Sequence, residues 1–116
     1  FWVAEDRASG QLAGMIGLHI PAPELPFSPC VEVGWRLARR FWGRGLATEG
    51  AKAALDFAWN VLKLDEVVSF TAVQNKPSQA VMQRLGMKAD AQTFLHPALP
   101  EEHTLAEHCL YRIRCA

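Results

Sequence analysis

The sequence predicts an α/β (α+β) domain in which a mixed, mostly antiparallel sheet is flanked by helices. Apolar, strand-length runs near the start of the chain are typical of an antiparallel hairpin. Further along, the hydrophobic period changes from two residues to three or four, which indicates helices between the later strands. With 116 residues, half of them hydrophobic, the chain can bury one core but has no room for a second. We therefore expect one domain over residues 1–116.

The first part of the chain predicts three strands. Phe1 to Glu5 and Leu12 to Ile20 are apolar runs that flank a polar, glycine-containing turn, as in a hairpin. Prolines crowd the stretch from Pro21 to Pro29, which we expect to be a surface loop. Residues Val31 to Leu37 then alternate, so every second side chain shares a face. One face of this third strand holds Val31, Val33, Trp35 and Leu37, and the other holds Glu32, Gly34 and Arg36.

The second part of the chain predicts two helices and three strands. Apolar residues recur every three or four positions from Leu46 to Leu62, which predicts an amphipathic helix of about four turns. Val67 to Val73 is β-branched and aromatic, as expected of a central strand covered on both faces. A short helix should follow Asn75 and stop before Gly86. Two closing strands are expected, at Lys88 to Leu95 and at His108 to Ile113.

Charge and cysteine usage argue against several classes of protein. Lys and Arg together number 12, as do Asp and Glu, so the overall field favours neither nucleic acid nor an anionic membrane. Any phosphate-binding site must therefore be local. The three cysteines lack disulfide or metal-ligand spacing, and we find no leader or membrane-length apolar run, which predicts a cytoplasmic location. Because the chain opens without Met inside a strand-like run, we expect that residues upstream are missing.

A glycine-rich junction joins the third strand to the first helix, and it consists of Arg40, Trp42, Gly43, Arg44, Gly45, Leu46 and Ala47. Unpaired N–H groups and the positive end of the helix dipole make such a helix start suited to pyrophosphate. The glycines let the backbone approach a ligand, and the arginines add positive charge. The spacing is not that of the nucleoside-triphosphate loop, and it weakens a dinucleotide-binding interpretation. Taken alone, the pattern fits a plain strand-to-helix turn equally well.

Two ordered motifs resemble those of the GNAT acetyltransferases. Arg40-x-x-Gly43-x-Gly45 is similar to the Arg/Gln-x-x-Gly-x-Gly/Ala motif that this superfamily carries between a strand and a helix. Asn75-x-x-Ser78, followed by Leu85-Gly86-Met87, is similar to its second block. The run Trp42 to Glu49 resembles the branch of ribosomal-protein N-terminal acetyltransferases. The resemblance implies acetyl transfer from acetyl-coenzyme A to a primary amine, a protein N-terminus or a small-molecule amine, by direct attack in a ternary complex.

The resemblance also implies how the cosubstrate is held. In GNAT proteins the strand before the glycine-rich loop and the strand before the motif asparagine splay apart, and the pantetheine arm enters the gap. The strand backbone would contact this arm, the loop amides would contact the pyrophosphate, and the second motif would line the opposite wall. The implied cofactor-binding residues are Trp35, Arg36, Leu37, Arg40, Trp42, Gly43, Arg44, Gly45, Leu46, Ala47, Asn75 and Ser78. The family's initial strand and two helices, which precede the hairpin, are expected to be absent from this sequence.

Glu32 and Ser78 are the candidate catalytic residues. Glu32 is the one carboxylate on the alternating strand, so it can take a proton from the amine, directly or through water. Alternatively it is an exposed strand residue or a partner of Arg36. Many GNAT enzymes have a tyrosine as general acid where this chain has Met82. Ser78 resembles a hydroxyl that could relay a proton to sulfur, although it could equally cap the second helix.

No metal site is predicted, because the four histidines lack ligand spacing, and for His103 and His108 solvation is the simpler expectation. The segment from Phe94 to Pro100 looks like a substrate-side loop of some GNAT proteins.

A noncatalytic acyl-coenzyme A-binding or partner-assembly module is the alternative to an enzyme. Without the family's first strand, Phe1 to Glu5 becomes a sheet edge, and we expect a homodimer or pairing with the missing N-terminal segment.

Overall fold

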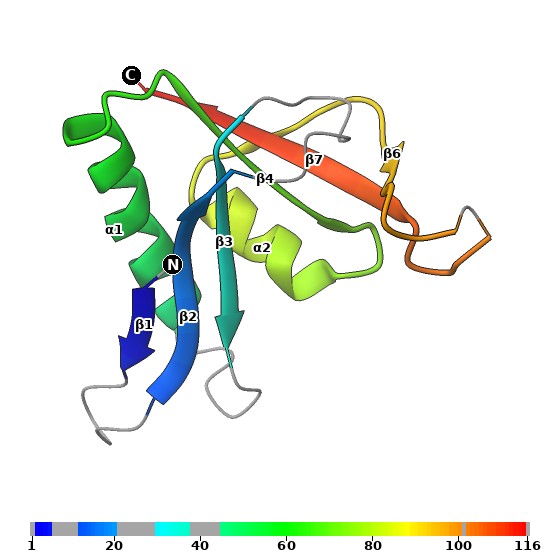
Figure 1. The fold of residues 1–116 in the computed structure, drawn as a ribbon, viewed down its shortest axis with the longest axis horizontal. Coiled ribbons are helices and arrows are strands. Elements are labelled where there is room, and N and C mark those ends of the chain that lie inside the picture. Colours follow the sequence, from blue (N-terminus) through cyan, green and yellow to red (C-terminus); the bar gives the residue numbers. More distant parts are fainter. Residues whose placement is uncertain (1, 6–11, 21–29, 38–44, 101, 116) are drawn as a thin grey trace.

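In the computed structural model, which describes residues 2–5, 12–20, 30–37, 45–100 and 102–115, a sheet lies beside two helices (Figure 1). The described strands are β1 (Trp2–Glu5), β2 (Leu12–His19), β3 (Glu32–Leu37), β4 (Glu66–Ala72), β5 (Lys88–Ala89), β6 (Phe94–Leu95) and β7 (Glu107–Arg114). The described helices are α1 (Leu46–Asn60) and α2 (Lys76–Arg84). The predicted loop at 21–29 and most of the glycine-rich junction lie outside the described residues.

The strands form one sheet in the order β1-β2-β3-β4-β7-β5, and β6 also pairs with β7. Its described neighbours are antiparallel except β3 and β4, which are parallel and meet only where Glu32 is opposite Val68. β3 stays paired with β2 from Glu32 to Leu37. Figure 1 shows β3 and β4 diverging from their meeting point. This splayed, mostly antiparallel sheet confirms the predicted fold class.

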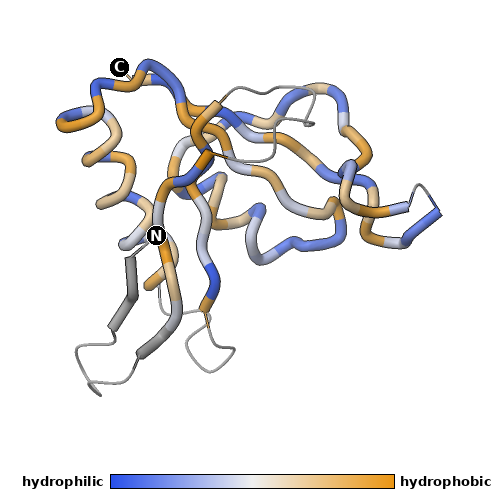
Figure 2. The backbone as a smooth tube through the Cα atoms, viewed as in Figure 1, coloured by the Kyte–Doolittle hydropathy of each residue, from blue (hydrophilic) through white to orange (hydrophobic). Residues whose placement is uncertain are grey.

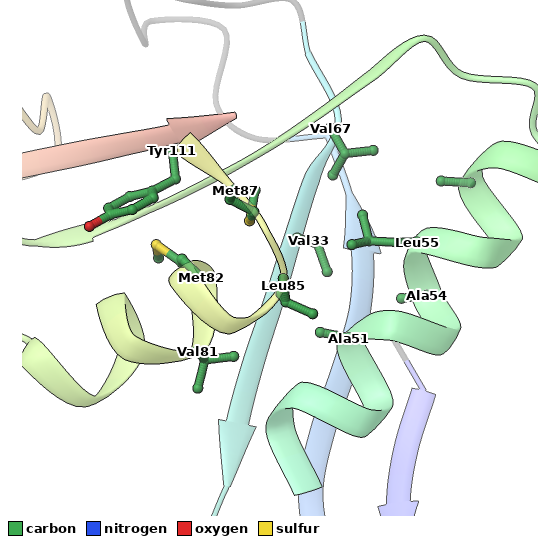
Figure 3. Packing of buried hydrophobic residues seen from close by; sticks show 11 residues of the cluster. Val33, Ala51, Ala54, Leu55, Val67, Val81, Met82, Leu85, Met87 and Tyr111 are labelled. Carbon is green, nitrogen blue, oxygen red and sulfur yellow. The ribbon is translucent and has the colours of Figure 1, made fainter. Parts of the chain in front are cut away.

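Both helices share one hydrophobic core with the sheet (Figure 3). The apolar stripe predicted for the first helix is buried, because Ala51, Ala54 and Leu55 of α1 all face the cluster. α2 contributes Val81 and Met82, and Leu85 at its C-cap joins them, from the other side of the cluster. Hydrophobic and hydrophilic stretches alternate along α1 in Figure 2, as expected for a helix with one buried face. This shared core holds both helices against the sheet.

The end of α1 differs from the prediction. The apolar period extended to Leu62, but the helix ends at Asn60 and Leu62 is 46% exposed. Lys63 adopts a left-handed conformation with φ of 56°, and the amide of Leu64 donates to the carbonyl of Ala58. This is the hydrogen-bond pattern of a helix C-terminus closed by a left-handed residue. Leu64 therefore packs against the core in place of Leu62.

The predicted strand from Lys88 to Leu95 is wrong as a continuous element. It is divided into β5 and β6, which pair with different parts of β7. Side chains anchor the interruption at both ends: Arg112 Nε donates to Asp90 Oδ1 at 3.0 Å, and Thr93 Oγ1 donates to Glu107 Oε2 at 2.6 Å. The chain thus leaves the edge of β7 between these contacts and returns to it. Such tertiary contacts carry no local sequence signal.

Candidate active site

Two cavities lie along β3, one between β3 and β4 and the other between β3 and the two helices. The first has a volume of about 670 Å³ and is lined by Met15, His19, Glu32, Gly34, Trp35, Arg36, Ser69, Phe70, Thr71, Asn75, Ser78, Met82 and His96. The second has a volume of about 490 Å³ and is lined by Trp35, Arg36, Leu37, Gly45, Leu46, Ala47, Thr48, Asn75, Pro77, Ser78, Ala80, Val81 and Arg84. They share Trp35 and Arg36 from β3, and Asn75 and Ser78 from the start of α2. The two cavities therefore meet at the splayed strands.

The second cavity collects the predicted cofactor-binding residues that the structure describes. Its walls include Trp35, Arg36, Leu37, Gly45, Leu46, Ala47, Asn75 and Ser78. Arg40, Trp42, Gly43 and Arg44 lie outside the described residues. Gly45 precedes the first turn of α1 with φ of 76°, a conformation that strains other residues, and no side chain of the described residues caps this helix start. The first turn of α1, which is the positive end of the helix dipole, therefore lies in the wall of this cavity.

Thr48, in the first turn of α1, was missed by the sequence analysis. Its side chain lines the second cavity, and its hydroxyl oxygen is buried without a hydrogen-bond partner among the described residues. An unpartnered buried hydroxyl is costly, and it commonly marks a place where a ligand supplies the missing contact. The one available signal was its position three residues after the second glycine of the loop.

Asn75 holds the start of α2 in place. Its Oδ1 accepts a hydrogen bond from the amide of Ser78 at 3.3 Å, and its Nδ2 donates to Thr71 Oγ1 at 3.1 Å. Asn75 is thus the N-cap that ties the helix to β4. The alternative in which Ser78 caps the helix is wrong, because Ser78 lies inside the first turn. Ser78 instead lines both cavities.

Glu32 is a buried carboxyl group in the wall of the first cavity. The residue is only 8% exposed, so the expectation of an exposed strand glutamate is wrong. Its ion-pair partner among the described residues is His19 rather than Arg36, with 2.9 Å between His19 Nε2 and Glu32 Oε1. Burial raises the pKa of Glu32 to about 8. The same effect lowers the pKa of His19.

His19 could not be identified from the sequence as the partner of Glu32. The two residues face each other because β2 and β3 pair in a register that places His19 opposite Glu32. Their connection runs through the proline-rich stretch at 21–29, whose length and composition do not determine a register. The only signal was that both residues stand at the ends of neighbouring predicted strands.

The far wall of the first cavity is aromatic and apolar. Phe70 and Met82 line it, and Met82 occupies the position of the tyrosine that was expected from the resemblance. His96 joins them, with its ring centroid 4.9 Å from that of His108 and 6.1 Å from that of Phe70. His96 Nδ1 accepts a hydrogen bond from the amide of Ala98, which fixes the ring. The expected solvation of His108 is wrong, since this half-buried ring packs among the others and burial lowers its pKa.

The described residues contain no group of three or more His, Cys, Asp or Glu side chains that could hold a metal ion. In the same part of the chain, neither helix has the length and apolarity needed to span a bilayer. What the cavities offer chemically is a buried carboxyl group on one side and a helix start on the other. This arrangement suits proton removal next to a bound phosphate-bearing molecule.

A comparison with protein families identifies the fold. The profile of the acetyltransferase (GNAT) domain matches residues 1–88. The chain belongs to the GNAT acetyltransferase family. Relatives of this GNAT chain include the uncharacterized protein YkkB of Bacillus subtilis, which is 34% identical over 74% of this chain and 49% of its own length. Another is the FsC-acetyl coenzyme A-N(2)-transacetylase of Aspergillus fumigatus, which is 36% identical over 77% of this chain and 39% of its own length.

Solved GNAT structures share the fold. The ribosomal-protein-S5-alanine acetyltransferase from Vibrio fischeri matches with a TM-score of 0.74 over 95% of this chain and 58% of its own chain. At 17% identity this match supports the architecture alone. The 116-residue GNAT chain spans half or less of the length of the curated relatives described above.

Proposed function

We propose that this chain forms the acetyl-coenzyme A-binding and catalytic core of an N-acetyltransferase that acts on a primary amine. The observation that carries the proposal is the meeting of two different cavities at the splay of β3 and β4. One presents a buried carboxyl group, Glu32, and the other presents the N-terminal turn of α1. An amine and a thioester that enter from the two sides would meet between Trp35 and Ser78. Membership of the GNAT family supports this reading.

The second cavity fits the cosubstrate. Coenzyme A carries a pyrophosphate, and the first turn of α1 offers its unpaired amides and dipole to such a group. The buried hydroxyl of Thr48, which has no hydrogen-bond partner among the described residues, can donate to it as well. Trp35, Leu37 and Val81 would flank the pantetheine arm. When bound, the cosubstrate supplies the activated acetyl group, and the chain's own residues position it.

Glu32 would act on the acceptor. An ammonium group cannot attack a carbonyl carbon, so the acceptor must lose a proton before or during the transfer. The N–H bond of the amine breaks and an O–H bond forms on the Glu32 carboxylate, directly or through one water. Ser78, which lines both cavities, is placed where its hydroxyl can donate a proton toward the departing sulfur. A thiolate with a pKa of about 8.5 needs little such help.

A protein N-terminus is the more accessible of the two acceptor classes that we consider. Deprotonating an α-amine with a pKa of about 7.8 costs roughly 1 kcal/mol at pH 7, whereas a lysine-like amine costs roughly 4.6 kcal/mol. A small-molecule amine of low pKa would be equally suitable. The aromatic wall formed by Phe70 and His96 favours an acceptor with an apolar or aromatic group beside its amine.

One observation favours a second function. Met82 stands where many GNAT enzymes have their general-acid tyrosine. A noncatalytic acyl-coenzyme A-binding module needs no general acid, so it would tolerate methionine at this position. Such a module would bind acetyl-coenzyme A but transfer nothing to N-terminal peptides, lysine peptides or small amines. A panel of these acceptors, assayed with the full-length gene product, therefore separates the two functions.

The proposed compartment is the cytoplasm. Acetyl transfer to newly made proteins or metabolites takes place where acetyl-coenzyme A is formed and used. Cys109 supports this location, because it is a thiol that donates to the carbonyl of Thr71 rather than half of a disulfide. Fractionation of cells that produce the tagged protein tests the location.

The role of Glu32 is tested by Glu32→Gln, which keeps the size of the side chain and removes the base. We expect kcat to fall by about 10²–10⁴-fold while the KM for acetyl-coenzyme A stays nearly constant. In the parent protein kcat/KM should rise as pH increases through the pKa of Glu32, because only the carboxylate accepts a proton. Glu32→Gln should lack this rise of kcat/KM with pH. Glu102→Gln changes an exposed carboxylate on the loop before β7 and serves as the matched control. If Glu32→Gln has the wild-type rate at pH 7, Glu32 is not the catalytic base and its role is structural.

A further inference from the structure

The pair formed by His19 and Glu32 joins two neighbouring strands at the apex of the splay. The residues are opposite each other in the β2–β3 ladder, and Glu32 is also the residue at which β3 meets β4. His19 Nε2 lies 2.9 Å from Glu32 Oε1, and both side chains line the first cavity. The carboxyl side chain is 10% exposed and the imidazole 41% exposed. The pair therefore has its acid inside the protein and its imidazole near solvent.

We propose that the contact from His19 favours the ionised form of Glu32, leaves the second carboxylate oxygen available to the acceptor amine, and so sets the pH at which the enzyme becomes active. His19 is a positioning residue in this scheme, because it acts on the base and not on the substrate. The inference rests on the proposed role of Glu32 as general base. It adds the residue on which that role depends.

Glu32 needs such a partner because its surroundings disfavour a charge. Burial raises its pKa to about 8 even with His19 beside it, so at pH 7 most Glu32 carboxyl groups carry a proton and cannot act as a base. A hydrogen bond donated to the carboxylate stabilises the charged form and works against burial. Neutral imidazole can provide it through Nε2–H, so the lowered pKa of His19 does not prevent the contact. When Glu32 is protonated, the same contact reverses and the carboxyl O–H donates to Nε2.

The other ionisable groups around the first cavity are placed less well for this task. Arg36 shares the strand of Glu32 but stands four residues along, roughly 13 Å away at the Cα atoms. His96 follows β6 and is bonded at Nδ1 to the amide of Ala98. β4 presents Ser69, Phe70 and Thr71, and α2 with its cap presents Asn75, Ser78 and Met82, none of which is charged. Among the residues that line this cavity, His19 is thus the one placed to stabilise the carboxylate.

The test compares His19→Ala with His19→Gln in the full-length protein. Alanine removes the donor, whereas glutamine keeps an N–H group on a side chain of similar reach. Two quantities are measured: the pKa of Glu32, from the ¹³C chemical shift of its carboxyl carbon in the protein without ligands, and the acid limb of the kcat/KM profile. His103→Ala, which removes an exposed imidazole outside the cavity, is the matched control.

In His19→Ala we expect the pKa of Glu32 and the acid limb to move together to higher pH by about one unit, which lowers kcat/KM about tenfold on the acidic side. Activity should approach the parent value at high pH, where Glu32 ionises without help. His19→Gln should recover most of the shift, and His103→Ala should show none.

Two results would count against the scheme in different ways. A Glu32 carboxyl shift that titrates identically in His19→Ala and in the parent protein overturns the inference, whatever the activity. If the pKa of Glu32 shifts in His19→Ala but the acid limb of the kcat/KM profile does not, the contact between His19 and Glu32 is supported. That result overturns both the control of activity by His19 and the role of Glu32 as the base. The NMR measurement requires no turnover, so the failure of the inference and that of the proposed function remain distinguishable.

Discussion

Two polar groups at the cavities, the carboxyl group of Glu32 and the hydroxyl of Thr48, are buried at a cost to the stability of the fold. The carboxyl group of Glu32 loses hydration, and the hydroxyl of Thr48 lacks a partner among the described residues. Proteins usually satisfy or eliminate such groups unless a ligand or a reaction uses them. Each of the two lies in a different cavity. Each cavity therefore contains one polar group whose burial destabilises the fold, as expected if each cavity binds one of two substrates.

Thr48→Val tests the cosubstrate side, because valine has the shape of threonine without its hydroxyl. Without ligand, we expect the free energy of unfolding to stay constant or rise by about 1 kcal/mol, since an unpaired buried hydroxyl is removed. The affinity for coenzyme A should fall about fivefold, the value of one lost hydrogen bond. Chemical denaturation and calorimetric titration measure the two effects. Thr104→Val, at an exposed position, is the control. An unchanged affinity would mean that the cosubstrate does not use this hydroxyl.

Elements with local signals were predictable, and elements defined by tertiary contacts were not. Residues Glu32 to Leu37 alternate, and both helices have a glycine or a capping asparagine at their start, so their positions follow from neighbouring residues. The division between β5 and β6 depends on bonds from Asp90 and Thr93 to β7, residues that are distant in sequence. The contact between His19 and Glu32 depends on strand register in the same way. The motif residues of the cavities were thus predictable, whereas their partners were not.

The pairing of β2 with β3 positions the strand that carries the site, and Gly14 permits it. A Cβ atom at Gly14 would lie 1.8 Å from the carbonyl oxygen of Arg36, and the residue has φ of 155°. Only glycine allows β2 to approach β3 so closely at this point. The close approach lies beside Arg36 and Leu37, which line the second cavity. The shape of this cavity therefore depends on a glycine that is not among its lining residues.

Gly14→Ala should reduce the free energy of unfolding by several kcal/mol, because backbone atoms of β3 cannot move away cheaply. Gly45→Ala is the matched control at a second glycine with positive φ. It has φ of 76°, and no atom of the other described residues lies within 4 Å of a Cβ there, so only strain of about 1 kcal/mol is expected. Urea denaturation of both variants measures the difference. Equal losses would show that close approach does not matter at Gly14.

At the scale of the whole molecule, the chain forms the sheet and the two helices that surround one cleft. It spans only part of its relatives, at 49% and 39% of the length of the two curated proteins described above. In the described residues, β1 is the outer strand on one side of the sheet and pairs only with β2. One row of its backbone N–H and C=O groups thus faces away from the sheet. A row of this kind readily pairs with a further strand.

We predict that the isolated 116-residue chain uses the outer edge of β1 to bind a second copy of itself or a separately supplied β-strand. The reason is that unpaired strand groups gain hydrogen bonds when another strand is added, at little conformational cost to a strand that is already extended. Sedimentation velocity over a range of concentrations measures self-association. Replacement of Val3 by proline, which removes a donor from this strand, provides the edge variant for comparison with the parent chain. A parent chain that stays monomeric at high concentration and does not bind the supplied strand contradicts the prediction. If the parent chain associates and Val3→Pro weakens this association, the contact lies on β1.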